Sequence, residues 1–154
     1  KEREFAQIVL ENKRRIYTVC YMFSKDADEV NDLFQEILIN LWKGLQSFEG
    51  DKFLSTWVWR VSLNTCINWS KKQKRALEKV PLDVNINLFE DMDEDSMQIR
   101  QLYDRINKLG YIDRSIILMW LENLSYDEIG SILGITANNV SVKLVRIREK
   151  LKSM

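Results

Sequence analysis

Residues 125–151 read SYDEIGSILGITANNVSVKLVRIREKL, and we expect this stretch to organise the fold of the chain. Ser125 stands three residues before Glu128, which predicts a capping box at the start of a first helix. Gly134 can adopt a positive φ where that helix ends, and Thr136 is a favourable N-cap for a second helix. The order of these signals predicts a helix-turn-helix, whose second helix enters the major groove of DNA.

The second helix of this motif divides into an apolar stripe and a polar side. Val140, Leu144, Ile147 and Leu151 recur at helical spacing, so we expect them to face the core. The polar side carries amides and hydroxyls that can bond base edges, followed by cations that suit phosphates. The candidate duplex-binding residues are Ala137, Asn138, Asn139, Ser141, Lys143, Arg146, Arg148 and Lys150.

A helical hairpin that merely closes a small core is the alternative to a DNA-binding motif, and the stretch by itself does not decide between them. One residue favours the true motif. Gly130 lies inside the first helix, where glycine is about 1 kcal/mol less favourable than alanine. A close crossing of the two helices at that point would require a residue without a side chain.

The composition predicts an all-α fold. The chain has 154 residues with one proline and five glycines, 45% of them hydrophobic and 30% charged. We expect two small helical bundles joined by an acidic linker, the second ending in the helix-turn-helix. The predicted boundaries are residues 1–75 for the first bundle, 76–95 for the linker and 96–154 for the second bundle.

Several classes of site and location are disfavoured. There is no histidine, and Cys20 and Cys66 lie isolated in apolar helical patterns, so we expect no metal, cofactor or catalytic residue. Buried thiols suit a reducing cytoplasm. No apolar run approaches the ~18 residues of a membrane span. The charged start, residues 1–4, does not resemble a signal peptide, and the absence of an initiator Met suggests a start inside a longer chain.

Charge is unevenly distributed although the net charge is zero. Residues 71–79 contain five basic side chains and one acidic side chain, whereas residues 81–104 contain seven acidic and one basic. DNA-binding proteins are usually more basic overall. Here the cations are concentrated after Trp69 and on the final helix, so nucleic-acid binding is expected at those two places.

A second helical segment is predicted from a cap at Asp26 to about Leu45, with a wide apolar stripe. Its polar side carries Asp28, Asp32, Gln35 and Glu36. This side is either a solvated face or a docking surface for a basic partner. Acidic residues near a helix N-terminus are also stabilised by the helix dipole, so the pattern alone leaves both interpretations open.

A third segment, Phe53 to about Arg75, interleaves tryptophans with amides and ends in a basic run. Aromatic faces that stack on bases and cations that hold the backbone are typical of single-stranded DNA surfaces. The candidate single-strand residues are Trp59, Arg60, Asn64, Asn68, Lys71 and Lys72. The alternative places the tryptophans in the core. We expect this for Trp57, and the pattern does not decide for Trp59 or Trp69.

The remaining helices are predicted from periodicity and capping signals. One spans Phe5–Phe23. In the second bundle, Ser96 is expected to cap a helix over Met97–Leu109 that stops at Gly110. Asp113 is expected to cap another over Arg114–Asn123.

The order of these parts resembles the extracytoplasmic-function group of bacterial sigma factors, the smallest sigma-70-type subunits of RNA polymerase. The part similar to the polymerase-binding motif is Asp28-Glu29-Val30-Asn31-Asp32-Leu33-Phe34-Gln35-Glu36, followed by Leu41-Trp42. Phe53, Trp57 and residues 60–68 resemble the part that melts and reads the minus-ten element. Residues 105–151 resemble region four, which reads the minus-thirty-five element.

The resemblance implies a cytoplasmic promoter-specificity subunit that is not an enzyme and does not insert into membranes. Its implied partners are core RNA polymerase, promoter DNA and an anti-sigma factor. Three positions depart from the family pattern, which commonly has Asp at Asn68, Ala at Gly130 and a basic residue at Glu149. The acidic residue at Glu149 leaves one cation fewer for phosphate contacts.

The main rival interpretation is a stand-alone helix-turn-helix regulator, which would bind duplex DNA as a dimer. It leaves the tryptophan-rich and acidic segments without an explanation. A recombinase is a weaker third interpretation, because no period-two pattern predicts the strands of a catalytic domain.

Overall fold

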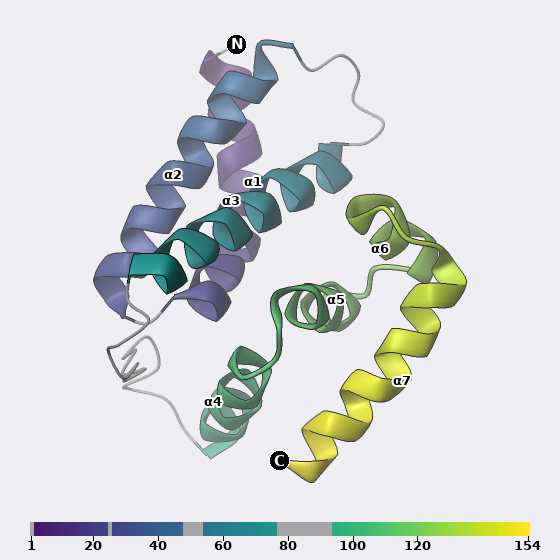
Figure 1. Ribbon diagram of the computed structural model, residues 1–154. Coiled ribbons are helices and arrows are strands. Elements are labelled where there is room, and N and C mark those ends of the chain that lie inside the picture. Colours follow the sequence, from purple (N-terminus) through teal and green to yellow (C-terminus); the bar gives the residue numbers. More distant parts are fainter. Residues whose placement is uncertain (1, 25, 48–53, 77–93) are drawn as a thin grey trace. The chain divides into compact units, whose positions relative to one another are not determined.

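The computed structural model describes residues 2–24, 26–47, 54–76 and 94–154, and within these ranges all regular structure is α-helical (Figure 1). The helices in chain order are α1 (Glu2–Phe23), α2 (Ala27–Leu45), α3 (Leu54–Ala76), α4 (Glu94–Asn107), α5 (Tyr111–Leu121), α6 (Tyr126–Leu133) and α7 (Ala137–Ser153). The prediction of an all-α chain is confirmed. None of the described helices is long and apolar enough to cross a membrane.

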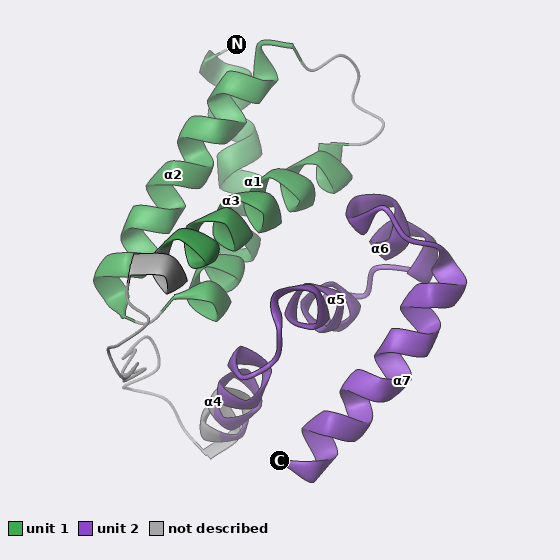
Figure 2. Cartoon of the chain, in the orientation of Figure 1, with its two compact units in different colours: residues 1–88 green, residues 89–154 purple. Residues whose placement is uncertain are grey.

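The chain divides into two compact units, residues 1–88 and residues 89–154 (Figure 2). Helices α1, α2 and α3 belong to the first unit, and α4 to α7 belong to the second. The predicted acidic linker, residues 76–95, falls mainly on residues 77–93, outside the described part of the chain.

In the first unit, α1, α2 and α3 pack against one another around a single core. The side chains of Ile16, Leu33 and Leu41 are fully buried there. Each buried aliphatic side chain of this size contributes about 1.5–3 kcal/mol to folding. The cap predicted for α2 is present, since a carboxylate oxygen of Asp26 accepts a hydrogen bond from the Glu29 backbone N–H at 2.8 Å.

In the second unit, α7 packs against α5 and α6, and α4 adds to α5. The predicted capping box is present, because Ser125 and Glu128 each bond the other's backbone N–H, at 3.1 and 3.3 Å. Gly134 ends α6 at φ 77°, and Thr136 caps α7 by accepting from the Asn139 N–H at 3.1 Å. The predicted core stripe of α7 is buried as expected: Val140, Leu144, Ile147 and Leu151.

Two predicted helix starts in the second unit are wrong. Helix α4 begins at Glu94, so Ser96 lies inside it rather than at its cap. Helix α5 begins at Tyr111, with Gly110 as N-cap and Asp113 in the first turn. The backbone of Gly110 is extended and its carbonyl accepts from the Arg114 N–H at 2.9 Å, which starts the helix without a side-chain cap. An acidic residue favours the first turn as well as the cap, and sequence cannot separate these positions.

The end of α4 is held by a buried cation. Arg114 is 8% exposed, and its Nη2 donates to the carbonyls of Asn107 at 2.6 Å and Leu109 at 2.8 Å. These carbonyls lie where the intrahelical ladder stops, so the guanidinium satisfies acceptors that the helix end leaves open. These two hydrogen bonds hold the turn between α4 and α5, and α5 in turn packs against α7.

Gly130 lies where α6 meets the turn that begins α7. A Cβ at this position would lie 2.5 Å from the backbone oxygen of Ile135 and 3.4 Å from the carbonyl carbon of Thr136. The Gly130 carbonyl accepts hydrogen bonds from the N–H groups of Gly134 at 2.7 Å and Ile135 at 3.0 Å. Gly130 therefore does lie at a close approach, but its partner is the backbone of the turn rather than a crossing of the two helices.

We expect Gly130→Ala to destabilise the second unit by about 1–3 kcal/mol, because the added methyl overpacks against backbone that cannot move aside. In an open helix the same change would stabilise by about 1 kcal/mol. Chemical denaturation of the full chain measures the difference. Gly110→Ser is the matched control: nothing lies within 4 Å of a Cβ there, and the new hydroxyl can cap α5. Equal stabilisation by both changes would contradict this account.

Candidate nucleic-acid interface

The N-terminal half of α7 presents short polar side chains on the side away from the core. Asn138 and Asn139 are exposed, and Ala137, Ser141 and Lys143 are half-buried. Arg146 follows in an exposed position two turns from the helix start. The caps and the buried stripe hold the helix in one orientation, so these amides, the hydroxyl and the cations lie at fixed positions around its outward side.

Two exposed apolar residues on the same helix were missed by the sequence analysis. Val142 is 43% exposed and Val145 is 60% exposed. A signal was available, because both lie off the stripe that contains Val140 and Leu144.

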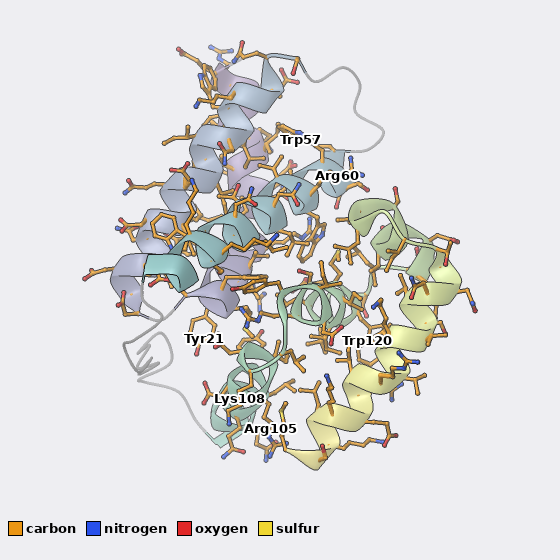
Figure 3. The ribbon with its side chains drawn as sticks, viewed as in Figure 1. Tyr21, Trp57, Arg60, Arg105, Lys108 and Trp120 are labelled. Carbon is orange, nitrogen blue, oxygen red and sulfur yellow. The ribbon has the colours of Figure 1, made fainter. Side chains whose placement is uncertain are left out.

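Two of the predicted duplex-binding cations face other side chains of the second unit. The guanidinium carbon of Arg148 lies 5.1 Å from the ring centroid of Trp120, a residue of α5 labelled in Figure 3. The ammonium of Lys150 lies 4.0 Å from a carboxylate oxygen of Asp113. A cation over an aromatic ring contributes about 0.5–1 kcal/mol at an exposed site, and an exposed ion pair contributes less. Two cations in the C-terminal half of α7 therefore contact side chains of α5.

Helix α3 carries a stripe of polar residues at helical spacing. Arg60, Asn64, Asn68, Lys71 and Lys72 are all exposed. Trp57 lies one turn before Arg60 and is half-buried (Figure 3). A Cβ at Gly44 would lie 2.9 Å from the Cζ2 atom of Trp57, so this glycine lets the indole lie against α2. The predicted single-strand residues other than Trp59 thus share one outward face.

The placement of Trp59 corrects the sequence-based prediction. Its side chain is 1% exposed, and Arg15 of α1 lies over its ring with the guanidinium carbon 5.2 Å from the centroid. A buried ring has no free face on which a base can stack. Trp59, which the sequence left undecided, is therefore a core residue, whereas Trp57, expected in the core, is half-buried against α2. The buried stripe of α3 includes the polar residue Ser62, which interrupts the helical periodicity of its hydrophobic residues.

Trp69 is half-buried, and its indole N–H donates to a carboxylate oxygen of Glu29 at 3.3 Å. This bond ties the end of α3 to the start of α2. A hollow of about 360 Å³ lies beside it, lined by Glu36, Asn40, Thr65, Asn68, Trp69 and Lys72. The amide of Asn40 donates to the hydroxyl of Thr65 at 2.9 Å across the two helices.

The acidic side of α2 is a surface feature. Asp28, Asp32, Gln35 and Glu36 are all exposed. Glu36 lines the same hollow as Asn68 and Lys72. The first unit therefore presents an acidic face on α2 next to a basic and amide face on α3.

Comparison with known proteins finds two matching families. Residues 8–76 match Sigma-70 region 2, and residues 99–151 match Sigma-70, region 4. The chain is 29% identical over 162 residues to the ECF RNA polymerase sigma factor SigW of Bacillus subtilis, which covers 96% of this chain and 87% of that protein. The chain belongs to the extracytoplasmic-function (ECF) group of sigma-70-type sigma factors.

A second relative and a solved structure are also sigma factors. The ECF RNA polymerase sigma-E factor of Escherichia coli K12 is 26% identical over 171 residues, covering 97% of this chain and 85% of that protein. The fold is similar to that of the sigma factor RpoE of Bartonella quintana, solved in complex with the anti-sigma factor NepR. That match has a TM-score of 0.77 at 20% identity, covering 98% of this chain and 96% of that one. ECF sigma factors act in transcription initiation and are not enzymes.

The two arginines on α7 should respond differently to loss of charge. Arg148→Gln removes the cation over Trp120, so we expect the free energy of unfolding to fall by about 0.5–1 kcal/mol. Arg146→Gln makes the same chemical change at an exposed site and should alter stability by less than about 0.5 kcal/mol. Urea unfolding followed by tryptophan fluorescence and circular dichroism measures both. An equal loss in the two variants would show that the Arg148–Trp120 contact contributes nothing.

Proposed function

We propose that this ECF sigma factor binds core RNA polymerase and directs promoter-specific initiation through two DNA elements. The observation that carries the proposal is the separation of the two sigma regions. The region 2 match, residues 8–76, lies in the first compact unit, and the region 4 match, residues 99–151, lies in the second. Two independent folded surfaces on one chain suit two separate sites on one promoter.

The second unit reads the minus-thirty-five element as duplex DNA. Recognition helices contact base edges with their N-terminal residues. On α7 these are Ala137, Asn138, Asn139, Ser141 and Lys143. Asparagine amides pair with adenine N6 and N7, and lysine pairs with guanine O6 and N7. Arg146 faces phosphate, with Arg148 and Lys150 at the flank.

The first unit reads and melts the minus-ten element along α3. Its exposed stripe runs from Arg60 through Asn64 and Asn68 to Lys71 and Lys72. Amides can bond unpaired base edges, while the cations hold the strand's phosphates. Trp59 does not belong to this DNA-binding face, because its side chain is buried.

The acidic face of α2 docks on core polymerase. Asp28, Asp32, Gln35 and Glu36 form an exposed acidic and amide surface suited to a basic partner. An anti-sigma factor is a further proposed partner, since RpoE was solved with the anti-sigma factor NepR. The proposed location is the cytoplasm, where the polymerase acts, and the proposed role involves no enzymatic step.

Charge reversal at Asp32 and Glu36 tests the docking surface. The double variant Asp32→Lys/Glu36→Lys should lose co-purification with core polymerase while its circular dichroism and melting temperature stay near wild type, because exposed changes usually alter stability by under about 0.5 kcal/mol. Glu4→Lys/Glu11→Lys on α1 makes the same charge change at exposed sites and should still co-purify. Retention of the first double variant on the polymerase would remove this surface from the proposal.

Run-off transcription with core polymerase tests the function itself, on templates randomised in both promoter elements. Wild type should enrich a distinct sequence at each element. Asn139→Ala and Lys143→Ala should cost about 1–3 kcal/mol on the preferred upstream element and relax its base profile, leaving the downstream profile unchanged. Asn68→Ala should relax the base profile of the downstream element and leave the upstream profile unchanged. Absence of sequence enrichment at either element would refute the proposal, and tight duplex binding by a free dimer would favour a stand-alone regulator.

A further inference from the structure

The outward face of α7 carries an apolar pair among its polar residues. Val142 and Val145 lie one turn apart, so their side chains are neighbours on the helix surface. They are 43% and 60% exposed, whereas Val140 and Leu144 on the opposite side are 0% and 2% exposed. The core of the second unit is therefore closed without the pair.

Helix stability does not explain the pair. Valine is stiff at χ1 and less favourable in a helix than Ala, Lys or Gln, so it is a poor choice at an exposed helical site. A single exposed apolar side chain is ordinary on protein surfaces. Position is what distinguishes these two. Asn138 and Arg146 stand four residues before and after Val142, so the apolar pair lies within the surface proposed to face DNA.

We propose that Val142 and Val145 are specificity residues that read thymine 5-methyl groups in the upstream promoter element. The inference rests on the proposed function of α6 and α7. In the major groove, thymine is distinguished by its methyl group, and apolar side chains recognise it by direct contact. Two valines one turn apart present adjacent methyl-sized apolar patches with no polar atom to desolvate.

The neighbouring residues suggest which bases accompany the thymines. The amide of Asn138 can donate to adenine N7 and accept from its N6, so an asparagine beside a valine suits adjacent adenine and thymine. The upstream element should therefore contain at least one thymine that owes its preference to its methyl group. Burial of one such group contributes about 0.8 kcal/mol, equivalent to about fourfold in binding.

Replacement of thymine by deoxyuridine isolates the methyl group, because uracil keeps the hydrogen-bonding pattern. The upstream element is first selected from the randomised library by holoenzyme containing the full chain. Each thymine in it, on either strand, is then replaced singly, and promoter binding and run-off transcription are measured. Wild type should lose about fourfold at one or two positions. Val142→Ala should abolish the loss at one of them, and Val145→Ala at the same or the neighbouring one.

Leu10→Ala is the control variant, since Leu10 is a 71% exposed hydrophobic residue of α1 in the other unit. It should retain the full wild-type loss at every position. The inference is overturned if no thymine is enriched upstream, if wild type is indifferent to uracil, or if both valine variants keep the wild-type loss. A holoenzyme that selects no upstream sequence would instead refute the proposed function of α7.

Discussion

The approach of Gly130 to the backbone of the following turn is the constraint on which the second unit depends. A Cβ at this position would lie 2.5 Å from the carbonyl oxygen of Ile135, so a side chain here would force the turn backbone to shift. Gly134 completes the turn in the left-handed region at φ 77°. With the turn closed, Thr136 reaches its capping position and α7 begins with one defined face inward.

A fixed α7 divides its side chains into three groups with different tasks. Val140 and its stripe fill the core, and the amides at the N-terminal end face outward. Arg148 lies over the ring of Trp120, and Lys150 lies beside the carboxylate of Asp113, both on α5. The sequence alone predicts that Arg146, Arg148 and Lys150 contact phosphates. The structure shows that Arg148 and Lys150 also lie against side chains of α5.

Local signals in the sequence predicted most of the helices and several of their ends. Capping boxes and positive-φ glycines depend on residues within four positions of one another, so the caps at Asp26, Ser125 and Thr136 could be identified directly. Prediction failed at Ser96 and Asp113, because acidic and hydroxyl residues are compatible with both a cap and a first turn. Gly110 starts α5 with its backbone alone, and no side chain signals that.

The sequence by itself determined the all-α class, the helix-turn-helix, the core stripe of α7 and the family resemblance, since each depends on periodicity or on short spacings. Only the tertiary structure decided which tryptophan is buried. Trp57 and Trp59 are two residues apart, and their exposure depends on where α1 and α2 lie against α3. It likewise placed Arg148 over the ring of Trp120. Such outcomes depend on contacts between helices, which the order of residues within a helix does not specify.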